Sequence, residues 1–184
     1  MNKPAFKFQL RILLLSALFA SCSAQSTPNK LTTGNAQLAL QPVVNPGTLH
    51  STKEAAISSL GGKVPPNLEI LKYSERRTSG DTTQGWYVVE KTPIITRSDL
   101  QYARAEPVIY RGGYNVSLKL RPRAAENFRE WTKANSGNYL AIVLDGVVIS
   151  APVVKGEIPN GDVIIEGDFT KEEAENLSVK MRRN

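Results

Sequence analysis

The sequence is poor in the side chains that bind metals and form disulfides. Its 184 residues include one cysteine, Cys22, and one histidine, His50. A single cysteine forms no disulfide within the chain, and Cys/His zinc sites need several such ligands. A Ser-His-Asp or Cys-His catalytic site would have to be built on His50. The sequence therefore predicts no catalytic site, no metal site and no cofactor.

Long apolar runs are also absent. A membrane-spanning helix needs about 20 apolar residues, and no stretch of the sequence reaches that length. The chain begins instead with Lys3, Lys7 and Arg11, followed by the short apolar stretch 12–20 and small residues. This order is typical of a secretory signal peptide, which we expect over residues 1–21.

The end of this signal, Leu18-Phe19-Ala20-Ser21-Cys22, resembles the bacterial lipoprotein signal. The resemblance implies that Cys22 is lipidated, which would anchor the chain to a membrane without spanning it. Ser23 stands where an aspartate would imply inner-membrane retention, so the outer membrane is favoured and the chain is expected on the periplasmic face. The alternative is ordinary cleavage after Ala24.

Acidic and aromatic residues are missing from residues 23–53, where Ser, Thr, Asn, Gln, Gly and Pro dominate. Such a composition buries little apolar surface and is typical of a flexible spacer. We therefore expect a tether over residues 22–53, with His50 exposed, and a folded domain over residues 54–184.

Net charge gives little support to a nucleic-acid partner. The formal charge of the whole chain is +6, but residues 1–21 hold three cations and no anion, so it falls to +3 without them. This balance is too small for the basic patch typical of nucleic-acid binding.

Apolar patterning predicts an α+β domain, an antiparallel β-sheet with helices packed on one face. Asp145-Gly146, between two β-branched runs, indicates a tight hairpin, and Thr170 with Glu173 forms a capping box. Strict alternation over 114–120 places Val116, Leu118 and Leu120 toward a core. Strands are expected over 68–73, 86–89, 114–120, 139–144, 147–150 and 163–165, and helical segments over 53–60, 98–103 and 122–135 and from residue 170.

Three motifs follow one another in this domain: KTPIITRSDLQYA, LAIVLDGVVISAP and IIEGDFTKEEAENL. Their order resembles the periplasmic head of SecD, a membrane component of the bacterial protein-export accessory complex SecDF, over residues 85–181. The resemblance implies a SecD-head-like fold and a role with exported or unfolded polypeptide, or docking to export or assembly machinery. The matching positions include Lys91, Pro93, Thr96, Asp99, residues 140–144, Asp145, Gly146, Ile149, Gly167, Phe169, Thr170 and Glu173.

Two departures from the family pattern are visible. Arg97 follows Thr96 where the family usually has glycine, and Arg121-Pro122-Arg123 opens a helix where a small polar cap and an acid are usual. Arg121 and Arg123, with Arg111, would form either a docking place for an acidic peptide or lipid headgroup or a solvated basic face.

The hairpin after Asp145 supplies the other candidate contacts, Val147, Val148 and Ile149. Alternation turns either Val147 or Val148 away from the core, where it would extend a contact patch or pack on a neighbouring loop. We expect shallow apolar and backbone contacts at a sheet edge, as in β-augmentation.

The leading hypothesis is a non-catalytic, lipid-anchored envelope protein that binds exported polypeptide or docks to export machinery. The second is a structural assembly module that binds a dedicated envelope protein partner and no client. The third is a hydrolase that uses His50 or Asp145. The expected partners are therefore polypeptide or an envelope protein, and a membrane through Cys22, with no nucleic acid.

Overall fold

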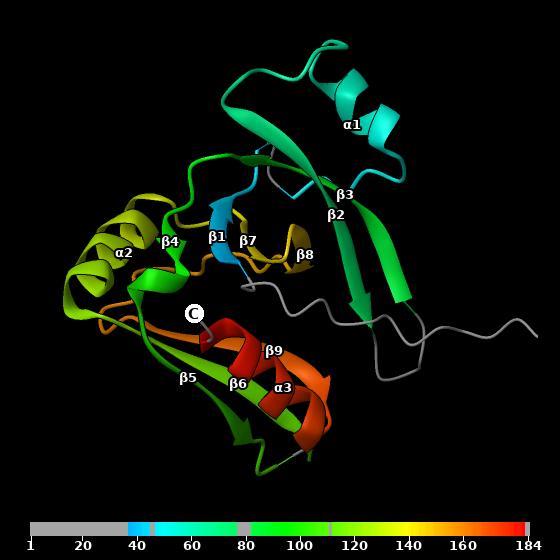
Figure 1. Ribbon diagram of the computed structural model, residues 1–184. Coiled ribbons are helices and arrows are strands. Elements are labelled where there is room, and N and C mark those ends of the chain that lie inside the picture. The colour runs from blue at the N-terminus through cyan, green and yellow to red at the C-terminus, as the bar shows by residue number, and fades with distance from the viewer. Residues whose placement is uncertain (1–36, 45–46, 77–81, 111, 183–184) are drawn as a thin grey trace, which may run out of the picture. The chain divides into compact units, whose positions relative to one another are not determined.

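Two β-sheets and three α-helices form in the part of the chain that the structure describes (Figure 1). The structure, a computed structural model, describes residues 37–44, 47–76, 82–110 and 112–182. The elements are β1 (Leu38–Pro42), α1 (Lys53–Ser59), β2 (Leu68–Arg76), β3 (Thr82–Glu90), β4 (Ile95–Thr96), β5 (Leu100–Pro107), β6 (Tyr114–Leu120), α2 (Pro122–Ala134), β7 (Leu140–Leu144), β8 (Val147–Ser150), β9 (Asp162–Phe169) and α3 (Lys171–Arg182).

The larger sheet has the strand order β3-β2-β8-β7-β1-β4 and the smaller sheet the order β5-β6-β9. The predicted α+β class is confirmed, but the expectation of one antiparallel sheet with helices on one face is wrong. The larger sheet is mixed, because β2 and β8 pair in parallel across a long crossover. The helices are divided between the sheets: α1 contacts β2 and β3, whereas α3 packs on the smaller sheet.

The predicted tether is wrong where the structure describes it. Residues 38–42 form β1, which lies between β7 and the edge strand β4 of the larger sheet, both far away in the sequence. Leu38 and Leu40 are buried in the main core, with exposed fractions of 3% and 0%. Residues 38–42 form a strand although the surrounding composition is polar. The strand is stable because β7 supplies its hydrogen-bond partners.

The segment after β1 closes against β3. Val43 pairs with Val89, and His50 exchanges two backbone hydrogen bonds with Trp86, at N–O distances of 3.0 and 2.9 Å. His50 is therefore half-buried and its backbone is part of the fold, contrary to the exposed loop position expected for it. The folded domain consequently begins before residue 54.

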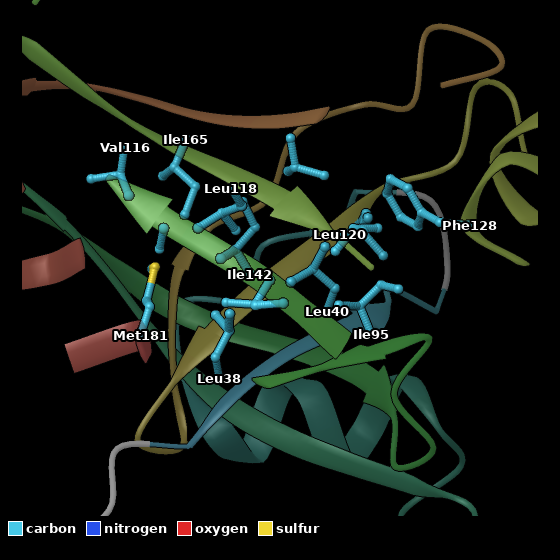
Figure 2. Packing of buried hydrophobic residues seen from close by; sticks show 14 of the residues in the cluster. Leu38, Leu40, Ile95, Val116, Leu118, Leu120, Phe128, Ile142, Ile165 and Met181 are labelled. Carbon is cyan, nitrogen blue, oxygen red and sulfur yellow. The ribbon is translucent and has the colours of Figure 1, made fainter. Parts of the chain in front are cut away.

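The main core lies between the two sheets (Figure 2). Val116, Leu118 and Leu120 of β6 point into it, as their alternation predicts, and each is at most 1% exposed. Phe128 of α2 and Met181 of α3 complete it. Both faces of β7 are buried, because Leu140 and Ile142 enter this core while alternate residues enter a second cluster inside the curled larger sheet.

Local sequence signals are followed by the structure at α2 and at the start of α3, but not at residues 98–103. The helix predicted over 122–135 is confirmed as α2, and the capping box is present, with Glu173 N donating to Thr170 Oγ1 at 3.2 Å. The helical segment predicted over 98–103 is wrong. A 3-10 turn at Arg97–Asp99 leads directly into β5, because pairing with β6 overrides the local helical signal.

Candidate functional site

The outer edge of β9 in the smaller sheet is open. β9 pairs with β6 on one side, and among the described residues no backbone hydrogen bond joins its other side to another segment. Val163 and Ile165 point into the core, whereas Ile164 between them is 55% exposed. An open edge presents unpaired N–H and C=O groups, which can accept an additional strand.

A groove of about 470 Å³, here called the β9 groove, runs beside the start of this edge. Beneath it lie the core residues Leu40 of β1, Phe128 of α2 and Ile142 of β7, each at most 1% exposed. Val153, which is 39% exposed, lies at the groove with Ile164. Extended backbone and apolar pockets therefore meet in one place, on segments far apart in the sequence.

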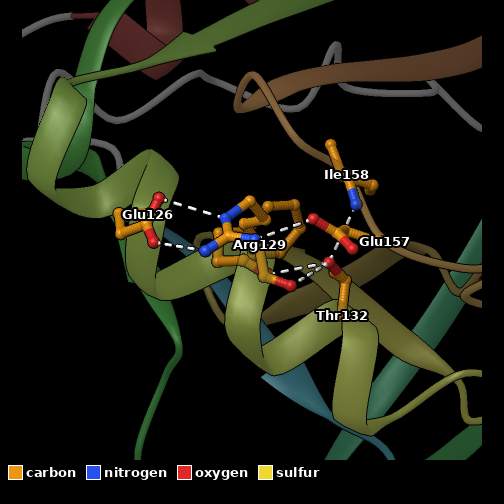
Figure 3. Close-up of polar contacts among 6 residues, drawn as sticks. Glu126, Arg129, Thr132, Glu157 and Ile158 are labelled. Carbon is orange, nitrogen blue, oxygen red and sulfur yellow. Dashed lines mark hydrogen bonds and ion pairs between the residues drawn. The ribbon is translucent and has the colours of Figure 1, made fainter.

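The wall of the β9 groove opposite the strand is the segment 152–158, which is fixed at several points. Leu140 N donates to Pro152 O at 3.0 Å, and Val154 N donates to Asn138 O at 2.8 Å. Ile158 N donates to the buried hydroxyl of Thr132 at 3.1 Å (Figure 3). These bonds give the groove a preformed shape, which lowers the entropic cost of binding.

Charge on this wall is organised around Arg129 of α2. Its guanidinium donates to Glu126 on the same helix and to Glu157 on the wall, at 2.9 Å for Glu157 (Figure 3). The hydrogen bond from Arg129 holds the pKa of Glu126 below its ordinary value. Hydrogen bonds to Glu126 and then Glu157 raise the pKa of Arg129, so the cation persists at any physiological pH.

The structure contradicts the proposed role of the hairpin after Asp145. The turn itself forms as predicted, with φ of 53° at Asp145 and 76° at Gly146. However, β8 lies between β2 and β7, so it offers no open edge. Val148 is 0% exposed in the second cluster and is not a contact residue. Val147 and Ile149 are only half-buried, and Ile149 packs against the main core.

The predicted arginine cluster is described in part. Arg121 and Arg123 are exposed at the start of α2, and Arg111 lies outside the described residues. Arg121 Nε donates to Ser98 O at 3.1 Å, and Arg121 N donates to Asp99 O at 2.8 Å. These bonds tie the helix start to the 97–99 turn. Cys22 also lies outside the described residues.

A second groove, of about 580 Å³, lies at the opening of the curled larger sheet and is here called the Lys91 groove. It brings together five of the matching positions from two different motifs, Lys91, Pro93, Thr96, Val143 and Gly146. Arg97 and Ser98 line it as well, which places Arg121 beside it. Sequence reasoning missed both grooves, because each depends on strand neighbours that local patterns do not reveal.

The structure brings no acid–base pair together at His50 or Asp145, the two residues of the hydrolase hypothesis. The backbone of His50 pairs with Trp86, while Asp145 Oδ1 accepts a hydrogen bond from Gln37 N at 3.0 Å. Within the described ranges, no group of three or more His, Cys, Asp or Glu side chains could hold a metal ion. Across those same ranges, none of the helices has the length and apolar character needed to cross a membrane.

An α+β head with a mixed curled sheet, a smaller sheet and an open β9 edge defines the class of domain. The chain belongs to the SecDF P1 head family, since the model of the "SecDF, P1 head subdomain" matches residues 69–184. It is 39% identical over 120 residues to the protein translocase subunit SecD of Aquifex aeolicus, and 36% identical over 137 residues to that of Desulfurispirillum indicum.

Solved structures agree with the sequence comparison. This chain is 30% identical to SecDF in its super-membrane-facing form, with a TM-score of 0.55. The superposition covers 80% of this chain and 19% of the SecDF chain. A second SecDF structure, of a membrane component that enhances protein export, has a TM-score of 0.55 at 29% identity, covering 80% and 62% of the two chains. The matches to the two SecD subunits cover 65% and 72% of this chain, but only 22% and 25% of the relatives' own length.

Proposed function

We propose that this chain binds extended segments of exported or unfolded polypeptide at the β9 groove. The observation that carries the proposal is the open edge of β9 beside an apolar groove with a fixed opposite wall. A segment added as a strand would use its backbone for affinity and alternate side chains for contact with the exposed apolar residues of the groove, Val153 and Ile164. Membership of a family of protein translocase subunits supports this choice of ligand.

A peptide series separates strand addition from general stickiness. The first probe is an eight-residue peptide that alternates valine and threonine, which matches the length of β9. The second has the same sequence with alternate amides N-methylated, so it keeps the apolar side chains but loses half of its backbone donors. We expect fluorescence anisotropy to detect the first peptide and to show at least about tenfold weaker binding of the second.

A matched pair of variants locates the contact. Ile164→Lys places a charge on the exposed face of β9, and Val179→Lys makes the same change at an exposed apolar residue of α3. We expect the first to weaken peptide binding by about tenfold or more and the second to leave it nearly unchanged. Equal binding by both variants, or by both peptides, would contradict the proposal.

The alternative is a structural assembly module that binds one dedicated envelope partner. This alternative predicts a different experimental result. A pull-down would recover one stable, stoichiometric partner, and neither peptide would bind. The exposed apolar side chains at the β9 groove are compatible with such a partner, but the open backbone edge favours a polypeptide without fixed structure.

We also propose that Cys22 is lipidated and holds the chain at the periplasmic face of a bacterial membrane, with the outer membrane favoured. Support comes from the signal-like sequence before it. Mass spectrometry of the mature N-terminus should find a lipid-modified cysteine as the first residue. An unmodified N-terminus at Gln25, after cleavage behind Ala24, would contradict the anchor.

A further inference from the structure

The turn that leads into β9 contains Asn160 followed by Gly161, the one Asn-Gly pair in the sequence. Asn160 is exposed, and no described residue forms a hydrogen bond with its side-chain amide. Its backbone carbonyl accepts from Lys119 Nζ at 2.9 Å, so the turn is held through its backbone. By contrast, the side-chain amides of Asn135 and Asn138 donate hydrogen bonds at 2.9 and 3.1 Å.

The fold requires glycine at position 161, where the chain is buried against α2. Its φ is 65°, in the left-handed region that favours glycine. A Cβ there would lie 2.5 Å from Cβ of Ala125 and 3.0 Å from Cβ of Leu120. Among the described groups, none accepts a hydrogen bond from Gly161 N. Because glycine has no side chain to hinder its own nitrogen, the structure keeps an unhindered backbone nitrogen directly after an asparagine whose side chain is unbonded.

We propose that Asn160 is a site of spontaneous deamidation, which converts it to aspartate and isoaspartate. The nitrogen of Gly161 attacks Cγ of Asn160, so that an N–Cγ bond forms and the Cγ–Nδ2 bond breaks. The side-chain nitrogen takes up the proton of the Gly161 amide and leaves as ammonia. Water, the one co-reactant, then opens the succinimide ring. Opening at Cγ gives aspartate, whereas opening at the backbone carbonyl gives isoaspartate, whose main chain is longer by one methylene.

The extra methylene of isoaspartate displaces the start of β9. Gly161 O accepts from Leu120 N at 2.9 Å, at the point where β9 begins to pair with β6. Asp162 and Val163, the next two residues, line the β9 groove. Isoaspartate at position 160 therefore alters the groove through the backbone, whereas aspartate adds only a charge. The deamidation itself does not depend on the function proposed above, but its effect on peptide binding rests on that function.

Incubation of the full chain in a non-ionic detergent tests the reaction, with peptide mapping by mass spectrometry. We expect aspartate and isoaspartate at residue 160, formed faster at mildly alkaline than at mildly acidic pH, because the attacking nitrogen must lose its proton. A synthetic peptide of residues 156–166 gives the rate without a fold. The folded chain should react within about tenfold of that rate, since exposed turns open at little cost. Asn138 is the internal control and should stay intact. Asn160→Gln should also stay intact, because its longer side chain would have to close a larger ring.

Hydrogen exchange measures the effect on the fold. In the chain with isoaspartate at position 160, separated by chromatography, the Leu120 amide should lose its protection. The variant Asn160→Asp carries the same charge on an ordinary backbone and should keep that protection.

Peptide binding gives the second readout. The isoaspartate chain should bind the alternating peptide at least about tenfold more weakly than Asn160→Asp does. The proposal is overturned if residue 160 stays intact while the synthetic peptide is converted, or if Leu120 is equally protected in the isoaspartate chain and in Asn160→Asp. Failure of the unmodified chain to bind the alternating peptide would contradict the function proposed above, while the mass spectra and hydrogen exchange would still decide the deamidation.

Discussion

At the scale of single residues, Arg129 links a helix to the wall of the β9 groove. It contacts Glu126 within α2 and Glu157 across the groove wall. Both ion pairs are partly exposed, so each contributes little to global stability. Their effect is local, because they set where the 152–158 segment lies relative to α2.

The lowered pKa of Glu126 is testable by titration. Because the folded state holds its pKa below the ordinary value of 4.5, the carboxylate stabilises the fold above that pH, and this contribution is lost as the pH falls through the lowered pKa. In NMR titrations of the side-chain carboxyl carbon, Arg129→Gln should move the midpoint upward toward 4.5. Lys133→Gln, on the same helix, is the control and should leave the midpoint in place. An unchanged midpoint in Arg129→Gln would contradict the assigned cause.

Residue patterns predict the structure correctly where it depends on local backbone chemistry. Asp145-Gly146 forms its turn because both positions need positive φ, which glycine and aspartate tolerate well. Val148 failed as a contact prediction for a different reason. Alternation shows that neighbouring side chains point to opposite faces, but it does not show that β8 has the second cluster on one face and the main core beside the other.

At the scale of elements, the buried hydroxyl of Thr132 joins α2 to the groove wall. The hydroxyl accepts the amide of Ile158, and the side chain is 0% exposed. Thr132→Val keeps the shape of the side chain but leaves that amide without an acceptor, which should lower the free energy of unfolding by about 2 kcal/mol.

Hydrogen exchange distinguishes this lost bond from a packing defect. The Ile158 amide should lose its protection in Thr132→Val and keep it in Thr132→Ser, which retains the hydroxyl and loses only a methyl group. We also expect the valine variant to bind the alternating peptide more weakly, because the groove wall is less fixed. Retained protection of Ile158 in Thr132→Val would contradict the role of the hydroxyl.

Two elements were mispredicted because long-range pairing decided them. β1 has a composition typical of a linker, yet it forms a strand between β7 and β4. Residues 100–103 follow a capping-box turn and resemble a helix start, yet they join β5 because β6 is available as a partner. In both cases the hydrogen bonds come from residues far away in the sequence.

At the scale of the whole molecule, the domain needs the residues before 54. A chain that begins at residue 54 lacks β1 and His50, which leaves one edge of β7 unpaired and removes Leu38 and Leu40 from the core. Burial of each leucine contributes about 2 kcal/mol. We expect this chain to show no cooperative thermal unfolding by circular dichroism, whereas a chain that begins at Gln37 should melt like the full domain. Cooperative unfolding of the shorter chain would place the boundary back at residue 54.

The sequence by itself determined the α+β class, the turn at Asp145-Gly146, the course of α2 and the family, because these depend on local backbone chemistry and on motifs in a fixed order. Only the tertiary structure decided which strand edge is open, that β1 belongs to the fold, and where the two grooves lie. The few scarce residues, Cys22 and His50, did not mark these places. Strand order and sheet curvature did, since they bring together side chains that no local pattern connects.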